Sequence, residues 1–178
     1  VVSDWSSDVC SSDLGAIYHV AVRKPDKALV CGRLTKDGLR PEGDYTALEG
    51  VTHATEAPAL FKRKGKYYLL GSASTGWNPN PARMFVADKI AGPYQSLGNP
   101  CFGINPHNQL GPEKAFGGQS TYVYPVAGRK DAWIAMFDIN KPDDPVNAGY
   151  IWLPVEFEGE QPVIRWRDQW DLSAFSKP

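Results

Sequence analysis

The chain has 178 residues and a formal net charge of −1, with acidic and basic side chains mixed along its length. This length suffices for one domain with a sizeable core. The lack of a basic patch argues against nucleic-acid binding, and there is no apolar run of the roughly 18 residues that a membrane-spanning helix needs. The aromatic share is 12%, and 17 glycines and 15 prolines mark frequent turns. This composition favours an all-β fold of short strands.

The first residues differ in character from the rest. Asp4 to Leu14 reads DWSSDVCSSDL, which one reading frame of a common short-read sequencing adapter encodes without a mismatch. We therefore interpret residues 1–14 as an adapter-derived artefact and base no expectation about the fold on them. A linker rich in Ser and Asp is the alternative that composition allows. On the adapter interpretation, the genuine sequence enters near Gly15 and continues a longer chain.

Short apolar stretches and turn residues alternate from Gly15 onward. In chain order, the expected strands are 16–22, 28–34, 59–63, 66–71, 83–88, 120–126, 132–138, 150–157 and 163–166. Lys64-Gly65 separates two of them by a typical hairpin turn. Residues 99–118 are rich in Gly, Pro and Asn, and a loop of that length is often functional.

Two groups of strands, 59–95 and 120–166, share one plan of hairpin, polar loop, strand, turn and short strand. Repeated four-stranded units are typical of the blades of a β-propeller. A β-sandwich is the alternative that the pattern allows. Either fold is all-β.

Once Cys10 is set aside with the adapter-like segment, Cys31 and Cys101 are the remaining cysteines. We expect free, buried thiols at both positions rather than a disulfide. No cluster of Cys and His has the spacing of metal ligands, so we expect no cofactor.

The segment 55–80, TEAPALFKRKGKYYLLGSASTGWNPN, carries the candidate chemistry. Glu56 directly precedes a strand–turn–strand unit that ends in a Gly-Trp-Asn loop. A carboxylic acid can protonate a glycosidic oxygen, and the flat ring of Trp77 can stack on the apolar face of a sugar. Asn78 and Asn80 are candidates for bonds to sugar hydroxyls. The alternatives are a core role for Trp77 and backbone-directed roles for the two asparagines.

The residues from Thr55 to Cys101, together with GGQSTYV (117–123), YIWLPVEF (150–157) and PVIRWRDQWDL (162–172), resemble glycoside hydrolase family 43. The likeness is closest to the galactan β-1,3-galactosidase and galactofuranosidase branches. It implies a five-bladed β-propeller with an active site at one end of the central channel. This chain would supply its C-terminal part: a blade remnant (15–50), a blade (57–98), a loop (99–118) and a blade (119–172).

The family resemblance also implies a reaction. Inverting hydrolysis uses two carboxyl groups roughly 6.5–9.5 Å apart, one protonating the leaving oxygen and one activating water. Glu56 of Glu56-Ala57-Pro58 matches the general acid of the family, and Gln119 of the Gln-Ser motif matches a candidate base-side residue. The remaining carboxylates would lie in earlier blades. A structural calcium ion occurs in some propeller channels, but no ligand set is readable here.

The resemblance therefore implies a polysaccharide or oligosaccharide substrate with galactose-type residues. It also implies that the full-length protein, of which this chain is a part, is secreted or periplasmic. Within the family, an α-L-arabinofuranosidase or galactofuranosidase is the alternative. A non-catalytic carbohydrate-binding propeller is the alternative from another class. We expect the 178-residue chain alone to be inactive, because essential carboxylates lie outside it, and to expose blade faces that missing blades would cover.

Other positions are expected to be structural. Asp138 is followed by Ile-Asn where family members usually have Arg-Trp, which weakens a site role for its loop. Trp133, Trp152, Trp166 and Trp170 alternate with apolar residues, so we expect them in the core.

Overall fold

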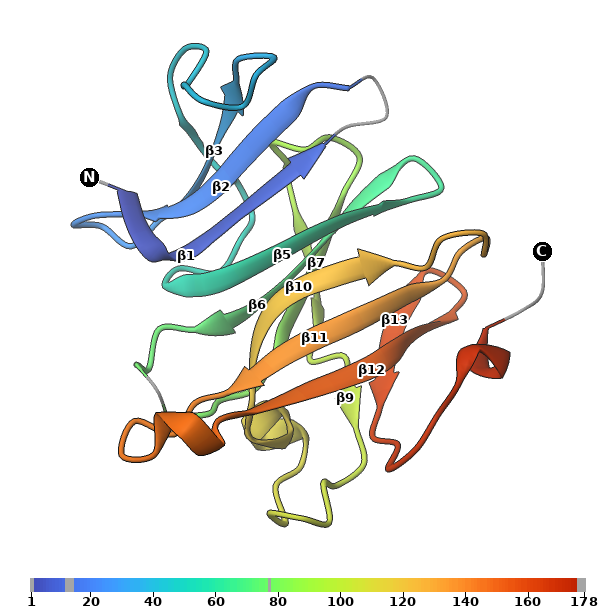
Figure 1. Cartoon of the computed structure of the whole chain (residues 1–178). Coiled ribbons are helices and arrows are strands. Elements are labelled where there is room, and N and C mark those ends of the chain that lie inside the picture. The colour runs from blue at the N-terminus through green and yellow to red at the C-terminus, as the bar shows by residue number, and fades with distance from the viewer. Residues whose placement is uncertain (1, 12–14, 77, 176–178) are drawn as a thin grey trace.

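The computed structural model describes residues 2–11, 15–76 and 78–175, and for residues 2–11 it describes the backbone (Figure 1). The strands are β1 (Val2–Ser11), β2 (Ile17–Arg23), β3 (Leu29–Leu34), β4 (Thr46–Ala47), β5 (Thr55–Arg63), β6 (Lys66–Ala73), β7 (Arg83–Ala87), β8 (Gln95–Gly98), β9 (Cys101–Phe102), β10 (Gln119–Pro125), β11 (Trp133–Ile139), β12 (Gly149–Glu158) and β13 (Gln161–Arg165). Three short 3₁₀ helices, η1 (Pro112–Gly117), η2 (Pro145–Asn147) and η3 (Leu172–Ala174), lie in the connections.

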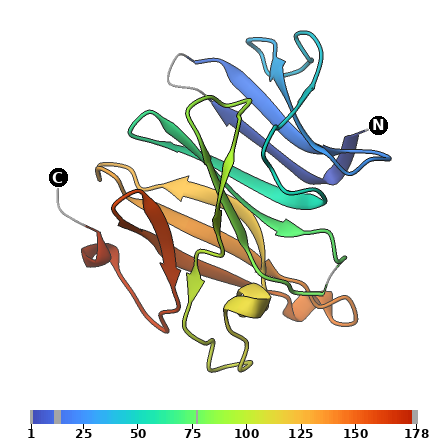
Figure 2. The same ribbon diagram turned by 180° about the vertical axis from the view of Figure 1, so that it is seen from behind.

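The strands form three sheets in the orders β1-β2-β3-β4, β5-β6-β7-β8 and β10-β11-β12-β13-β9. Each sheet is built largely as an antiparallel meander, and the sheets follow one another across the molecule (Figures 1 and 2). This arrangement confirms the all-β prediction and fits part of a β-propeller, in which each sheet is a blade.

Local sequence explains the hairpin that connects β5 and β6. Arg63 pairs with Lys66, and the two residues between them, Lys64 and Gly65, have φ angles of 48° and 81°. Positive φ at both central positions defines the turn type whose twist suits a tight hairpin. The predicted hairpin at Lys64-Gly65 is therefore confirmed.

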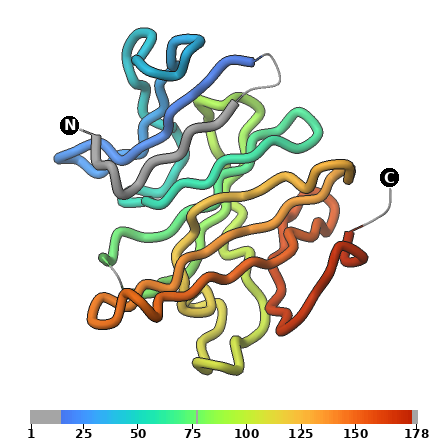
Figure 3. Tube along the Cα trace, viewed as in Figure 1, coloured from blue at the N-terminus to red at the C-terminus, as the bar shows by residue number. Residues whose placement is uncertain are grey.

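The backbone of β1 pairs antiparallel with β2, with Ser7 opposite Ala21 and Ser11 opposite Ile17. Figure 3 traces the path of the chain from β2 to β13. Ladder pairing uses N–H and C=O groups that almost every residue supplies. The pairing therefore says nothing about the origin of this segment, and the adapter interpretation of residues 1–14 stays a prediction.

Strand β9 is the main element that the sequence did not predict. It lies in the expected loop 99–118 but pairs parallel with β13, with Cys101 opposite Ile164. A two-residue strand has no periodicity to detect, and its partner is far away in sequence. Its formation depends on the tertiary fold.

The central sheet, β5–β8, is covered on both faces, because alternate residues of a strand point in opposite directions. Leu69 and Phe85 pack on one face with residues of β2 and β3. Tyr68, Leu70 and Met84 pack on the other face with β10–β13. Two hydrophobic clusters thus join three successive sheets.

The aromatic residues of the second cluster are partly as expected. Trp133 is buried, and its ring lies 5.6 Å from that of Phe61, which stacks on Tyr68 at 5.2 Å. Trp152 is 53% exposed, so the prediction of a core role is wrong for this residue. It lies on the face of β12 that points away from the central sheet. Alternation alone does not show which face of a strand is buried.

The two cysteines are free and buried, as predicted. Burial raises the pKa of Cys31 to about 11 and that of Cys101 to about 12. Both thiols therefore stay protonated at neutral pH and act as small apolar side chains.

The outward face of the last sheet is rich in exposed aromatic side chains. Tyr122 and Tyr124 on β10 and Tyr150 and Trp152 on β12 are all exposed. Register places Tyr122, Met136 and Trp152 side by side across the three strands. An apolar sheet face of this kind is what a further blade covers in a propeller.

Phe137 provides a test of the packing between the central and last sheets. It is fully buried in the cluster they share, so we expect Phe137→Ala to lower the free energy of unfolding by about 3–5 kcal/mol through lost burial and a cavity. Urea denaturation followed by fluorescence measures this. Val146→Ala, at a position that is 91% exposed, serves as the control and should change little. Equal effects of the two substitutions would contradict the assigned core.

Candidate active site

Glu56 lies at the start of β5, beside a bulge. It pairs with Ser72 on β6, whereas Ala59 pairs with Leu70, so β5 holds one extra residue between these positions. Ala57 adopts a φ of 52°, and Pro58 follows. A bulge bends a strand and redirects its side chains, and it tolerates a proline that a regular ladder excludes. The Glu-Ala-Pro sequence therefore has a local role in aiming the half-buried carboxylate.

Hydrogen bonds and close packing hold the start of β5, which carries Glu56, in place. The Arg83 guanidinium donates from Nη1 to Thr55 Oγ1 at 2.9 Å, and to the carbonyl oxygens of His53 and Ala54. Gly71 allows β6 to approach closely, since a Cβ there would lie 2.8 Å from Thr55 Cγ2. These contacts fix the backbone on either side of the bulge.

Gln119, at the start of β10, reaches Glu56 from the neighbouring sheet. Its Nε2 donates to Glu56 Oε1 at 3.0 Å and to Ser72 Oγ at 2.9 Å. The next residue, Ser120, is buried and donates from Oγ to the carbonyl oxygen of Ala57 at 2.8 Å. The structure thus brings together the two residues to which the sequence assigned catalytic roles, and the Gln119 amide orients the carboxylate.

A small pocket with a volume of about 20 Å³ opens beside Gln119. Its lining residues come from three segments of the chain: Gly76, Asn78, Pro79, Asn80, Gly117, Gly118, Gln119, Asp138 and Asn140. The lining is almost wholly polar or glycine, so it offers hydrogen-bonding groups and backbone surface to a ligand rather than an apolar slot.

Asp138 lines the pocket, although the Ile-Asn that follows it weakened the expectation of a site role for its loop. It lies directly opposite Gln119 in the β10–β11 ladder, so both side chains lie on the same face of the sheet. Burial raises the pKa of the Asp138 carboxyl above its ordinary value. The signal that could have identified it is its position at the end of a strand whose hairpin partner begins with Gln119.

The asparagines of the 75–80 loop differ in their contacts. Asn80 accepts from the Ala73 backbone N–H at 2.8 Å and donates to the Ala73 carbonyl and to Thr75 Oγ1. Its amide therefore shapes the loop. Asn78 is exposed at the pocket. Sugar contact by Asn78 and Asn80 stays a prediction, and Trp77 lies outside the described residues.

An unusual stretch of backbone directly precedes Gly117 and Gly118, which line the pocket. Ala115 and Phe116 have φ angles of 45° and 60°, in the left-handed region that non-glycine residues rarely adopt. The carbonyl oxygen of Phe116 accepts from the side-chain amides of Asn105 and Asn108 at 3.2 and 2.9 Å. Strain of this kind persists where surrounding bonds enforce it, and it occurs often at functional sites.

Neither a metal centre nor a membrane-spanning helix is found in the described part of the chain. Among its residues, no group of three or more His, Cys, Asp or Glu side chains could hold a metal ion. None of its helices combines the length and the apolar character needed to cross a membrane.

The chain is similar in fold to several solved structures. Two solved GH43 β-1,3-galactosidases, one with galactodeoxynojirimycin, are 35% and 30% identical to the chain, each with a TM-score of 0.83. The matches cover 94% and 96% of this chain and 46% and 34% of theirs. An exo-β-1,3-galactanase from Phanerochaete chrysosporium, solved with galactose, has a TM-score of 0.73 at 22% identity, over 92% of this chain and 35% of its own, which supports the fold alone.

The chain therefore spans less than half the length of these similar proteins. No protein-family model and no curated protein sequence matches it.

The partly desolvated carboxyl of Asp138, an exposed residue at the pocket, leads to a pH prediction. Its raised folded-state pKa means that the folded protein holds this proton more tightly than the unfolded chain does. The resulting stabilisation is present below the ordinary value of 3.8 and is lost as pH rises through the raised pKa. We therefore expect Asp138→Asn to be more stable than the wild type at about pH 7, with the difference shrinking towards about pH 4.

Urea denaturation across that pH range measures the difference. Asp143→Asn, at an exposed position, is the matched control and should show no such trend. A difference for Asp138→Asn that stays constant with pH would contradict a raised pKa at Asp138.

Proposed function

We propose that this chain, which belongs to glycoside hydrolase family 43, supplies the general-acid side of a glycosidase active site that releases galactose-type residues from polysaccharide. The observation that carries the proposal is the bond from Gln119 to Glu56 across two sheets, at the edge of a polar pocket. The names of the similar proteins, β-1,3-galactosidases, support the choice of sugar.

In this proposal Glu56 donates its proton to the glycosidic oxygen as the bond breaks. The Gln119 N–H holds one carboxylate oxygen, which leaves the other to face the leaving group. Inversion then needs a group on the opposite side of the sugar to activate water. The Gln119 amide lies 3.0 Å from Glu56, nearer than the roughly 6.5–9.5 Å that separates the two sides of an inverting site, and an amide cannot take a proton from water. In this proposal the water-activating carboxylate is therefore another residue, from outside residues 1–178, as the family resemblance implies.

Asp138 and Asn78 complete the proposed binding role of the pocket. Both line it beside Gln119 and offer an acceptor and an amide to sugar hydroxyls. The same polar lining suits an arabinofuranosidase or galactofuranosidase of the family. A non-catalytic sugar-binding propeller is the alternative in which Glu56 only accepts hydrogen bonds.

A chimera distinguishes these alternatives. Residues 15–175 replace the matching segment of the β-1,3-galactosidase that is 35% identical, which restores a full-length protein. We expect the chimera to release galactose from β-1,3-galactan, and Glu56→Gln to lower kcat by about 10²–10⁴-fold, the usual contribution of a general acid. On a dinitrophenyl galactoside, whose leaving group needs no proton, the same variant should retain most of its activity.

Glu49→Gln is the matched control, since Glu49 is an exposed Glu on the neighbouring connection. If Glu56→Gln impairs both substrates equally, Glu56 is not the general acid. If the chimera binds galactan without cleaving it, while the unmodified β-1,3-galactosidase cleaves it under the same conditions, the binding-propeller alternative is supported.

The isolated 178-residue chain should not turn over β-1,3-galactan or the dinitrophenyl substrate, because the water-activating carboxylate is outside it. Galactose release, measured with a coupled dehydrogenase assay at high protein concentration, tests this. Turnover by the purified chain that disappears in its Glu56→Gln variant would show that residues 1–178 hold a complete site.

A further inference from the structure

The pocket beside Gln119 is too small to enclose a sugar ring. Its volume is about 20 Å³, and a cavity needs roughly 10–15 Å³ of such volume to hold one water molecule. A hydroxyl group is about the size of a water molecule, whereas a pyranose ring is many times larger. The pocket therefore has room for one small substituent of a sugar whose ring lies outside it.

Packing of the main chain fixes the glycine wall of this pocket. A Cβ at Gly118 would lie 2.8 Å from the Cβ of Phe137 on β11, and a Cβ at Gly117 would lie 2.6 Å from Asn108 Nδ2. Gly117 also has a φ of 96°, which side chains with a Cβ rarely allow. The backbone thus lies directly against β11 and Asn108, so this wall cannot retreat to make the pocket larger.

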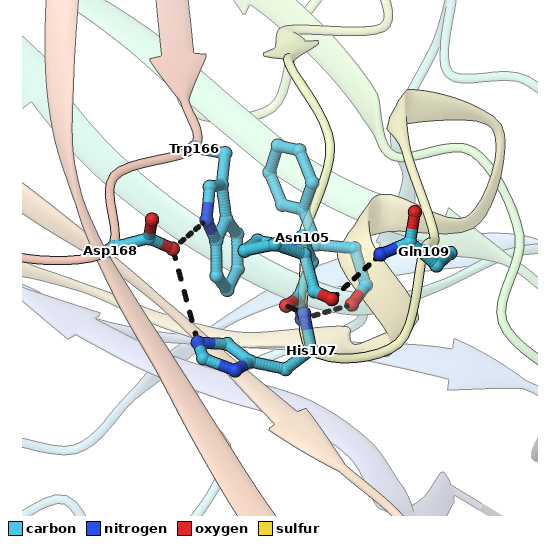
Figure 4. A network of polar contacts seen from close by, with 7 residues as sticks. Asn105, His107, Gln109, Trp166 and Asp168 are labelled. Atoms are coloured by element: carbon cyan, nitrogen blue, oxygen red, sulfur yellow. Dashed lines mark hydrogen bonds and ion pairs between the residues drawn. The ribbon is translucent and has the colours of Figure 1, made fainter.

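A network of side chains holds the turn that precedes these glycines. The carbonyl oxygen of Phe116 accepts from Asn105, and the Phe116 ring packs against Trp166 with 5.4 Å between centroids. Trp166 Nε1 in turn donates to Asp168 Oδ1 at 2.8 Å. Figure 4 shows Asp168 on one side of the indole and the turn that carries Asn105 and His107 on the other. Two segments that are far apart in sequence therefore keep this wall in place.

The Gln119 amide has one group left for a ligand. An amide nitrogen carries two N–H donors, and Nε2 of Gln119 uses them on Glu56 and Ser72. In the part of the chain that the structure describes, nothing donates to the Oε1 of Gln119, and this atom is not among the buried atoms that lack a partner. The carbonyl oxygen is therefore accessible as a hydrogen-bond acceptor.

Asp138 provides a second acceptor on the same face of the sheet, because it lies opposite Gln119 in the β10–β11 ladder. Partial burial raises the pKa of its carboxyl, and no hydrogen bond or charge from another described residue contributes to the rise. A partly desolvated carboxyl without a donor gains more from a ligand that donates to it than a fully solvated carboxyl does.

A hydroxyl group is the ligand group that suits these neighbours. It donates to an acceptor such as Asp138 or Gln119 Oε1, and it accepts from an amide such as that of Asn78 or Asn140. A methyl group would leave both acceptors desolvated and unpaired. A carboxylate would meet the charge of Asp138, and no Lys or Arg is among the described residues that line the pocket.

We propose that this pocket receives one neutral, hydroxyl-bearing substituent of the sugar unit at the cleaved bond, and that Asp138 determines this specificity by accepting the hydroxyl hydrogen. The choice of a galactose-type unit rests on the proposed function. The pocket thereby selects a hydroxyl over a hydrogen, a methyl or a carboxylate at one position of the sugar. Sites that hydrogen-bond a substrate hydroxyl discriminate strongly against analogues without it, because their own polar groups are then left unpaired.

Calorimetric titration of the full-length chimera with galactose and the series of its monodeoxy derivatives tests the proposal. We expect one derivative to bind at least about tenfold more weakly than galactose, because it lacks the hydroxyl that enters the pocket. In Asp138→Ala, galactose and that derivative should bind with similar affinity. The other derivatives should show the same ratio to galactose in the variant as in the wild-type chimera.

A second variant separates the charge of Asp138 from its shape. Asp138→Asn keeps a carbonyl acceptor but removes the charge, so it should retain part of the preference for the hydroxyl. It should also bind galacturonic acid more tightly, relative to galactose, than the wild-type chimera does. If Asp138→Ala does not fold, Asp138→Ser replaces it in the deoxy series.

Asp143→Ala is the matched control, since Asp143 is an exposed Asp of the following loop and does not line the pocket. Near-ultraviolet circular dichroism and the urea midpoint establish that each variant is folded. The proposal is overturned if all derivatives bind the wild-type chimera as galactose does, or if the preference is unchanged in Asp138→Ala. It is also overturned if the chimera does not bind galactose at millimolar concentration while the unmodified β-1,3-galactosidase does.

Binding is measured without hydrolysis, so the two proposals can fail separately. A chimera that cleaves galactan but shows no preference dependent on Asp138 would refute the pocket assignment alone. A chimera that shows this preference, but whose Glu56→Gln variant cleaves galactan as fast as the wild type, would refute the general acid alone.

Discussion

Glu56 and Gln119 lie in different sheets, and their contact depends on how those sheets pack face to face. The packing is fixed by the cluster of Phe61, Tyr68, Trp133 and Phe157, over which Arg63 lies at 3.9 Å from the Phe157 ring. Aromatic rings that interlock in this way resist sliding, since any shift opens gaps that nothing fills. The bonds of Ser120 and Gln119 to the central sheet then set the register of the two strand ends.

The pocket shows how irregular backbone is placed where chemistry is proposed. A bulge at Ala57 lies next to Glu56, and a left-handed turn at Ala115 and Phe116 directly precedes Gly117, which lines the pocket. Neither conformation is favourable alone, and each is held by side chains from elsewhere, Ser120 on one side and Asn105 with Asn108 on the other. The two hydrophobic clusters that join the sheets supply the rigidity that such strained segments need.

The sheets differ in how completely they are covered. The central sheet is buried on both faces, whereas the last sheet buries one face and presents tyrosines and Trp152 on the other. Chains that resemble this one are more than twice as long, so further blades are available in them to cover such a face.

The sequence determined the local features: the alternating strands, the Lys64-Gly65 hairpin, the buried free cysteines and the Glu-Ala-Pro and Gln-Ser motifs. Each depends on neighbours within a few positions, where backbone preference and alternation operate. Tertiary structure decided the rest. It paired β9 with β13, placed Asp138 opposite Gln119 and left Trp152 exposed. It also directed the Asn80 side chain to the backbone of Ala73. Each of these outcomes depends on which strand or sheet lies alongside. Alternation shows that a strand has two faces, but only the packed neighbours decide which face becomes core and which becomes site.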